Sequence, residues 1–379
     1  MAVCLLCSRL VSSAHAAESA GLVPDPLYEG KPLSYWVLGD TNSVLYFAPI
    51  HAGPYGYLDR YSREAVKNIG TNAIPFLLQL MESYPYRATE ALGVLGTNAH
   101  SAIPGLARFA TNQAPPRADS QTRVQIESAR KAAVSTLGRI DPEALPVLCA
   151  VATNRVFGRD VRITALSGIT SMGTNAGASA AALLQCLKDE DKHVVVSALL
   201  ALEHVPTNDQ EILLGILDCL DSQDPMLRRY AVSALAPFGE CVLPVLGRAV
   251  EDDDRIVRVR ALRALASLGK RALPAIIWGL KDDDPSVRGS ALEALVQAAP
   301  SALTNASVLA LGAEGLRSRG ERREWAAQLL RAAGQQAAGG QPDLQVRLPG
   351  GWDRVFQEAT NALRRLAPEL LQTGVSPQQ

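Results

Sequence analysis

The sequence predicts an all-α fold, a right-handed α-solenoid of about eight stacked antiparallel helix pairs. Residues 228–244 read Arg-x-x-Ala-Val-x-Ala-Leu-x-x-Phe-Gly-x-x-x-Leu-Pro, and residues 258–274 repeat the pattern thirty positions later. A third copy begins at Arg288. Of the 379 residues, 47% are hydrophobic but only 5% are aromatic, so Ala and Leu, both strong helix formers, build the core. A fixed period near thirty is typical of repeats that bury a shared core by stacking.

Each repeat predicts two helices joined by a short turn. The first helix has an apolar stripe, as at Ala231, Ala234 and Leu235, whose spacing faces a core. A glycine such as Gly239 ends it, because glycine adopts the left-handed conformation without a Cβ penalty. Three of these turns read Gly-Thr-Asn-Ala, where Thr or Asn is expected to cap the next helix. The second helices are predicted near residues 74–82, 103–111, 145–152, 179–187, 211–220, 242–250, 273–280 and 302–311.

Acidic turns end the repeats at residues 189–191, 252–254 and 282–284. An Asp just before a helix accepts hydrogen bonds from its free amides and complements its dipole. A calcium site is the alternative, but consecutive Asp side chains point in different directions and the clusters recur with the repeat. We therefore predict helix caps and no metal site. The repeat from His193 to Asp221 has Val195 in place of the expected Arg, so an irregularity is expected there.

The segments outside the repeats divide the chain further. Residues 18–61 are rich in Tyr and Trp and are predicted to cap the first repeat, with an aromatic ligand-binding loop as the alternative. Residues 62–331 form the solenoid, residues 332–351 a Gly/Gln-rich linker, and residues 352–379 a capping helix with a tail. Residues 1–17 form a candidate signal segment, because an apolar stretch precedes a Ser-Ala-His-Ala-Ala sequence similar to a cleavage site. Arg9 interrupts that stretch. Export to the periplasm or the medium is therefore the leading expectation, and a cytoplasmic protein is the alternative.

Composition and motifs argue against several classes of function. The formal net charge is −1, whereas a nucleic-acid binder usually shows a basic excess. No run of about 18 apolar residues predicts a transmembrane helix. The six cysteines and five histidines have no spacing typical of zinc or disulfide frameworks, and nucleotide-binding and hydrolase motifs are missing. We therefore predict no catalytic residue, no metal ligand and no cofactor.

The repeat also carries Pro, Asp and Arg at spacings of eight and six positions, as at Pro244, Asp252 and Arg258. This pattern resembles the HEAT repeat of the armadillo-type superfamily, in the short bacterial form also found in phycobilisome lyase-type proteins. The resemblance implies a ladder in which Arg and Asp side chains of neighbouring repeats form hydrogen bonds. The ladder residues would be Arg228, Asp252, Arg258, Asp282 and Arg288.

The predicted function is a non-catalytic scaffold that binds a protein partner through the concave surface of the solenoid, lined by the second helices. Trp278 falls one position off the core-facing set of its helix, and Arg248 holds the equivalent position one repeat earlier. Trp and Arg are residue types that anchor interfaces, so both are candidate partner-binding residues. Packing of Trp278 against the next repeat is the alternative. A second functional hypothesis, a phycobilin lyase-like enzyme or accessory that holds a small ligand, depends on the resemblance alone.

Overall fold

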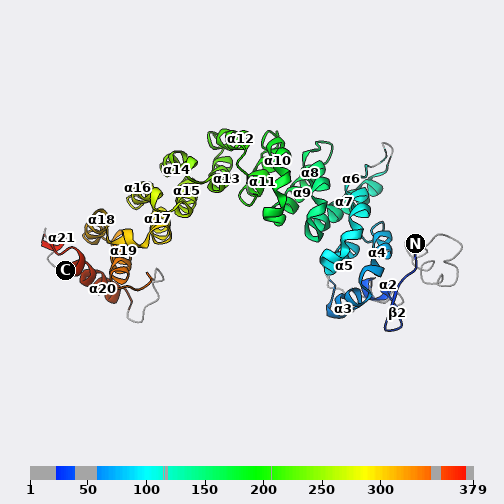
Figure 1. Cartoon of the computed structure of the whole chain (residues 1–379), viewed down its shortest axis with the longest axis horizontal. Coiled ribbons are helices and arrows are strands. Elements are labelled where there is room, and N and C mark those ends of the chain that lie inside the picture. Colours follow the sequence, from blue (N-terminus) through cyan, green and yellow to red (C-terminus); the bar gives the residue numbers. More distant parts are fainter. Residues whose placement is uncertain are drawn as a thin grey trace. The chain divides into compact units, whose positions relative to one another are not determined.

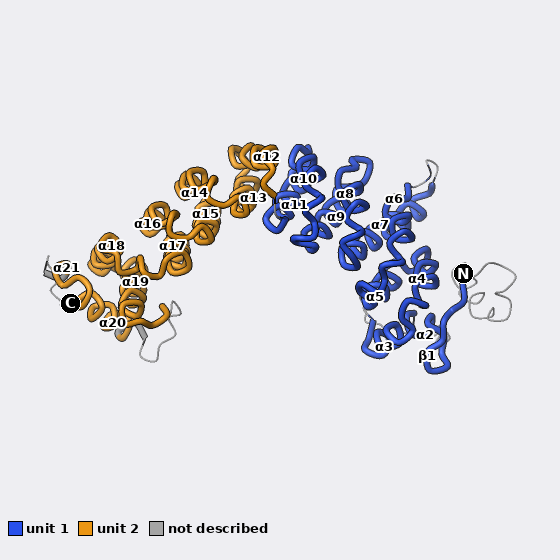
Figure 2. The backbone as a smooth tube through the Cα atoms, in the orientation of Figure 1, with its two compact units in different colours: residues 1–206 blue, residues 207–379 orange. Residues whose placement is uncertain are grey.

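The computed structural model describes residues 23–38, 58–113, 115, 118–205, 207–342 and 351–372. These residues form helices joined by short turns, together with one small two-stranded sheet (Figure 1). The chain divides into two compact units, unit 1 with residues 1–206 and unit 2 with residues 207–379 (Figure 2). The predicted all-α solenoid is confirmed. The candidate signal segment, residues 1–17, lies outside the described residues.

Unit 1 begins with a short hairpin and a helix that pack on the first repeat. Strands β1 (Leu27–Tyr28) and β2 (Lys31–Pro32) pair antiparallel, and α2 (Leu33–Leu38) follows directly. Trp36 is buried, and its carbonyl accepts a hydrogen bond from the Ser62 hydroxyl at 2.6 Å. Arg87 donates to the carbonyl of Val37 at 2.9 Å. These contacts attach the described part of the aromatic segment to the first two repeats, while its residues 39–57 lie outside the described ranges.

The repeats of unit 1 alternate a first and a second helix. The pairs are α3 (Arg60–Ile69) with α4 (Ile74–Leu80), α5 (Pro85–Leu95) with α6 (Ile103–Thr111), α7 (Ser120–Ile140) with α8 (Leu145–Thr153), and α9 (Arg159–Met172) with α10 (Ala180–Leu187). Helix α11 (Lys192–Leu202) is the last helix of the unit. The boundary between the units follows it, within the repeat whose sequence departs from the pattern.

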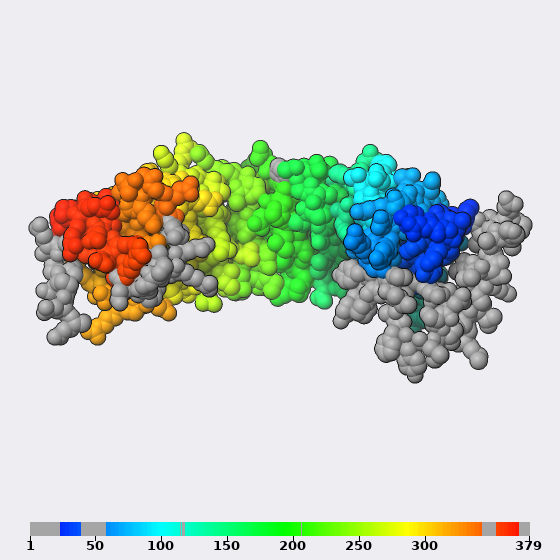
Figure 3. Space-filling model, turned by 90° about the horizontal axis from the view of Figure 1, so that it is seen from below, coloured from blue at the N-terminus to red at the C-terminus, as the bar shows by residue number. Residues whose placement is uncertain are grey.

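Unit 2 continues the alternation through ten helices among its described residues. They are α12 (Gln210–Leu220), α13 (Pro225–Leu235), α14 (Leu243–Ala249), α15 (Arg255–Ser267), α16 (Leu273–Gly279), α17 (Pro285–Ala298), α18 (Ala306–Leu316), α19 (Glu321–Ala337), α20 (Gly351–Leu366) and α21 (Glu369–Gln372). In the space-filling view, the surface of this unit passes from green through yellow to red in sequence order (Figure 3). Each repeat therefore packs mainly on the repeats next to it in the chain.

Most of the described turns between the two helices of a repeat contain a 3-10 turn with one glycine at positive φ, whereas the 3-10 turns at Pro142–Ala144 and Pro300–Thr304 have none. Gly96 has φ 55° and Gly173 has φ 53°, so the left-handed conformation that favours glycine is used here. The predicted capping by Thr or Asn of the Gly-Thr-Asn-Ala turns is wrong. Ala73, Ala102 and Ser179 precede the second helices in helical conformation, without a capping side-chain hydrogen bond. Because the 3-10 turn runs directly into the helix, no extended residue is left to place a capping side chain.

The acidic turns do cap helices, as predicted. Asp254 has an extended backbone, and its carboxylate accepts hydrogen bonds from the amides of Ile256 and Val257 at 2.8 and 3.2 Å. Asp191, Asp224 and Asp284 cap α11, α13 and α17 in the same way. These carboxylates satisfy amides that a helix start leaves without a partner.

The position of the last second helix was predicted wrongly. Residues 300–304 form a 3-10 turn, and α18 begins at Ala306 after Asn305. The side chain of Asn305 accepts a hydrogen bond from the Ser307 amide at 2.9 Å. Pro300 starts the turn and Asn305 caps the helix, so the helix begins four residues later than the repeat period indicates.

The predicted Gly/Gln-rich linker at residues 332–351 starts too early. Helix α19 continues to Ala337, and its residues Arg331 to Gly334 are buried. A Cβ placed on Gly334 would lie 2.6 Å from the Cβ of Ala362 on α20. Gly334 therefore allows two helices to approach closely, and its presence does not indicate a loop.

One stretch among the described residues, Pro225–Ala249, has the length and composition of a membrane-spanning helix. Its course is not that of a single helix, because Gly239 within it has φ 70° and ψ −145°. The chain turns there from α13 into α14. The stretch is a helix pair of the stack.

Candidate binding surface

The arginines and aspartates at fixed repeat positions join neighbouring repeats. Arg228 donates from Nε and Nη2 to the two carboxylate oxygens of Asp252, at 2.9 and 3.1 Å. Arg258 makes the same two bonds to Asp282, at 2.8 and 3.1 Å. Each of these arginines also donates from Nη1 to two main-chain carbonyls of the turn before its helix. Bidentate pairing fixes both side chains, so these four charges are structural, as the resemblance implied.

Two further pairs extend this network. In unit 1, Arg162 donates to Asp189 at 2.6 Å, and both side chains are buried. The hydrogen bond from Arg162 lowers the pKa of Asp189. In unit 2, Arg229 donates to both carboxylate oxygens of Asp254, which lowers the pKa of Asp254 to about 2. The Arg229–Asp254 pair was not predicted, because Val259 and Gly289 hold the position of Arg229 in the following repeats.

Arg288 does not form the carboxylate pair that the ladder implied. Its Nη1 donates to the carbonyls of Asp282 and Asp283 at 2.9 and 2.8 Å, as in the other ladder arginines. Its Nε is buried without a hydrogen-bond partner. Its guanidinium instead lies over the ring of Trp325, 5.6 Å from the centroid. The reason is a sequence change in the next turn, where Ser318 holds the position of Asp282 relative to the following helix.

The first and second helices form two rows in unit 2. Figure 1 shows α13, α15 and α17 along the inner side of the curve of this unit, and α12, α14, α16 and α18 along its outer side. The expectation that the second helices line the concave surface is therefore wrong for this unit. The helices that carry the ladder arginines Arg228, Arg258 and Arg288 occupy the inner side.

Trp278 and Arg248 lie on the outer row with their side chains exposed. Trp278 is 55% exposed, while Ile276 two positions before it is fully buried. The ammonium group of Lys281 lies 5.6 Å from the centre of the Trp278 ring. Arg248 is exposed at the equivalent place on α14. On α12, Leu214 is likewise 55% exposed. More than half of the Trp278 surface is therefore open to solvent.

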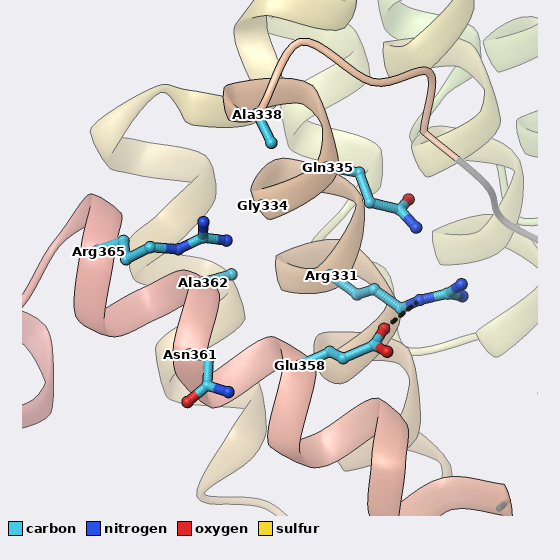
Figure 4. A pocket seen from close by; sticks show the side chains of 8 residues that line it. All are labelled: Arg331, Gly334, Gln335, Ala338, Glu358, Asn361, Ala362 and Arg365. Atoms are coloured by element: carbon cyan, nitrogen blue, oxygen red, sulfur yellow. Dashed lines mark hydrogen bonds and ion pairs between the residues drawn. The ribbon is translucent and has the colours of Figure 1, made fainter.

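A cleft of about 570 Å³ lies between α19 and α20 in unit 2 (Figure 4). Arg331 and Glu358 face each other across it, and Arg331 Nε donates to the Glu358 carboxylate at 2.9 Å. Its lining residues are Arg331, Gly334, Gln335, Ala338, Glu358, Asn361, Ala362 and Arg365. The lining offers charged and amide groups but no nucleophilic side chain, so the cleft suits polar binding better than covalent catalysis.

One group of described residues has the donor types of a metal site. His100, in the turn after α5, lies near Asp141 and Glu143, in the turn after α7, with ring nitrogen to carboxylate distances of 3.6 and 3.4 Å. No motif predicts this approach, because the residues are about forty positions apart. The two ring nitrogens of His100 face different carboxylates, and the Glu143 side chain is 73% exposed. This geometry is that of a surface ion-pair group, although its ligand atoms lie within 4.8 Å of one another.

Comparison with known families agrees with the repeat pattern. A family model described as HEAT repeats matches residues 212–296 and 242–331. Residues 212–331 of this chain are therefore HEAT repeats. They contain the Arg228–Asp252 and Arg258–Asp282 pairs, so the family match and the ladder rest on the same repeats. No curated protein sequence matches the chain.

Solved structures are similar to this chain at low sequence identity. An engineered protein is 19% identical with a TM-score of 0.40, over 86% of this chain and 93% of that one. YibA of Escherichia coli is 14% identical with a TM-score of 0.39, over 84% of this chain and 100% of that one. A chain of the Kap95:Nup1 complex is 15% identical with a TM-score of 0.52, over 81% of this chain but 46% of that one. The last similarity supports the α-solenoid fold.

Proposed function

We propose that this HEAT-repeat protein is a non-catalytic scaffold that binds a protein partner through an exposed ridge of unit 2. The ridge consists of Leu214 on α12, Arg248 on α14 and Trp278 on α16. The three residues lie on successive helices of the outer row, so one partner segment that crosses these helices can contact all of them.

The observation that carries this proposal is the exposure of Trp278. A tryptophan that is 55% exposed presents a large rigid apolar surface to solvent. The repeat does not require this residue, since Arg248 holds the same position one repeat earlier and Ile276 fills the core. Trp and Arg are enriched among residues that dominate binding energy at protein interfaces.

The Arg–Asp ladder also favours the ridge, because the charges of the ladder are already paired within the stack. Arg228 and Arg258 are committed to Asp252 and Asp282, so these arginines are not available to a partner. The similar Kap95 structure is a complex with Nup1, which is the kind of use proposed for this chain.

The proposal is tested by crosslinking from defined positions in the full chain. A photoreactive phenylalanine analogue replaces Lys281, which lies beside the Trp278 ring, in one variant and Glu293, which is exposed on the inner-row helix α17, in the other. We expect crosslinks to one partner protein from position 281 in the native host, and none to that protein from position 293. When it is added in excess, the Trp278→Ala variant without a photoreactive residue should not reduce the crosslinking of that partner. Equal crosslinking from both positions, or full competition by Trp278→Ala, would overturn the proposal.

A further inference from the structure

The Arg–Asp ladder occupies fixed positions relative to the residues that cap the first helices. The arginine lies four residues after a cap, and its carboxylate partner lies two residues before the next cap. The caps are Gly158, Asp191, Asp224, Asp254, Asp284 and Gly320. The complete pairs that result are Arg162–Asp189, Arg228–Asp252 and Arg258–Asp282.

Two repeats depart from this rule in different ways. In one, both members are replaced, because Val195 takes the arginine position and Ser222 takes the carboxylate position. In the other, Arg288 is kept and only the carboxylate is replaced, by Ser318. The repeat with Val195 therefore has neither member of the pair. The repeat with Arg288 keeps the cation but has no carboxylate that pairs with it.

The surroundings of Arg288 are built for an acceptor that the described residues do not supply. Arg288 is 3% exposed, and its Nε has no hydrogen-bond partner among the described residues. Trp325, which lies against the guanidinium, is 8% exposed, and its Nε1 also has no acceptor there. Buried polar groups are normally satisfied, so two neighbouring donors without acceptors point to a ligand that accepts from both.

The local charge also favours an anion. Burial lowers the pKa of Arg288, and the nearby guanidinium of Arg322 lowers it further, against the opposing effect of Asp282 and its neighbours. Arg322 is exposed at the start of α19, so the positive charge reaches the surface beside the buried donors. A bound anion would relieve the repulsion between these two arginines.

We propose that Arg288 and Trp325 form a binding site for a carboxylate, supplied by an acidic side chain of a protein partner or by a free carboxylate ion. Its oxygens accept from Nε and Nη2 of Arg288, in the way that Asp282 accepts from Arg258. Trp325 Nε1 provides a further donor. This site is separate from the outer-row ridge and does not depend on the function proposed for it.

The test restores the ladder's own carboxylate in the full chain. Ser318→Asp should raise the melting temperature, because the new carboxylate pairs with Arg288. The matched control is Ser222→Asp, which makes the same change in the repeat where Val195 replaces the arginine, and it should give a clearly smaller shift. The Ser222 hydroxyl and the carboxylates of Asp252 and Asp282 all accept from the amide two residues later, so the control preserves that bond. Equal shifts in the two variants would overturn the proposal.

The ligand arm compares sodium acetate with sodium chloride at equal ionic strength and neutral pH. Acetate should raise the melting temperature of the wild type and of Ser222→Asp, and the extra rise should be absent in Ser318→Asp, whose own carboxylate fills the site. A short peptide with one internal Asp then distinguishes the sources. Stabilisation at a lower concentration than acetate assigns the site to a protein side chain, and stabilisation at the same concentration assigns it to a free carboxylate. The same response to acetate in the wild type and in both variants would contradict the proposed carboxylate site.

Discussion

Helix α15 is joined to the turn before α17 by a charged pair, whereas α19 and α20 approach each other through a glycine. In the first region, Arg258 and Asp282 form two hydrogen bonds at 2.8 and 3.1 Å. In the second, Gly334 lies so close to Ala362 that a Cβ on the glycine would be 2.6 Å away from that residue. The charged pair is visible in the sequence as a motif, while the glycine contact is visible only in space. The two regions therefore teach different limits of prediction from a sequence.

The charged region is tested by Asp282→Asn, for which we expect the larger loss of stability of these two regions. The variant keeps a side-chain oxygen for the Asp284 amide, which donates to Asp282 at 2.8 Å, but it removes the charge opposite Arg258. Breaking a pair that is largely buried should lower the free energy of unfolding by about 2–3 kcal/mol. Urea denaturation measures the change. Asp283→Asn, at an exposed neighbour, is the control, and an equal loss there would show that the ladder carries no special stability.

The glycine region is tested by Gly334→Ala, with a somewhat smaller expected loss of about 1–3 kcal/mol, because the added methyl group forces α19 and α20 apart. Gly289→Ala on α17 is a control in the opposite direction. A Cβ at Gly289 would meet no atom within 4 Å, so this change should stabilise the helix by about 0.5–1 kcal/mol. If both variants behave alike in thermal unfolding, the close approach of α19 and α20 does not hold them together.

These two regions explain how far the sequence could lead. The period of thirty and the Asp caps follow from local spacing, so the helices could be predicted, and the resemblance to HEAT repeats implied the Arg258–Asp282 pair. The end of α19 could not be predicted, because a glycine such as Gly334 occurs both in loops and where two helices approach closely. The contacts of Arg288 and His100 also depend on residues that are far away in the sequence. Arg288 keeps its motif while its partner changes to Ser318, and His100 meets Asp141 only after folding.

The side on which Trp278 lies needed the structure as well. Its exposure followed from its place one position off the apolar stripe of α16. Which helices form the inner row depends on how successive repeats are rotated, and the period alone does not contain that rotation. For Trp278 the sequence left exposure and packing against the next repeat as alternatives, and it placed the second helices on the wrong side of the stack.

Acid should weaken a second charged pair, which joins Arg229 on α13 to Asp254 before α15. The hydrogen bond from Arg229 holds the pKa of Asp254 at about 2, below its ordinary value of 3.8. The stabilisation from this pair is therefore complete above about pH 4 and is lost as the pH falls towards 2. After solvent screening is considered, we expect a loss of about 1 kcal/mol between pH 5 and pH 2.5, measured by urea denaturation. Asp254→Asn should show a flatter dependence over this range, and an unchanged dependence would exclude Asp254 as its source.

The smallest effect on stability is expected at Trp278, which belongs to neither kind of contact. Trp278 is 55% exposed and the centre of its ring lies 5.6 Å from the Lys281 ammonium group, so Trp278→Ala should change the free energy of unfolding by less than about 0.5 kcal/mol. Ile276→Ala on the same helix is the matched comparison, because Ile276 is fully buried and its truncation should cost about 2–5 kcal/mol. A stable Trp278→Ala variant that fails to compete for the crosslinked partner would separate the residues that build the stack from those that it presents. A loss of stability comparable to that of Ile276→Ala would instead make Trp278 part of the packing.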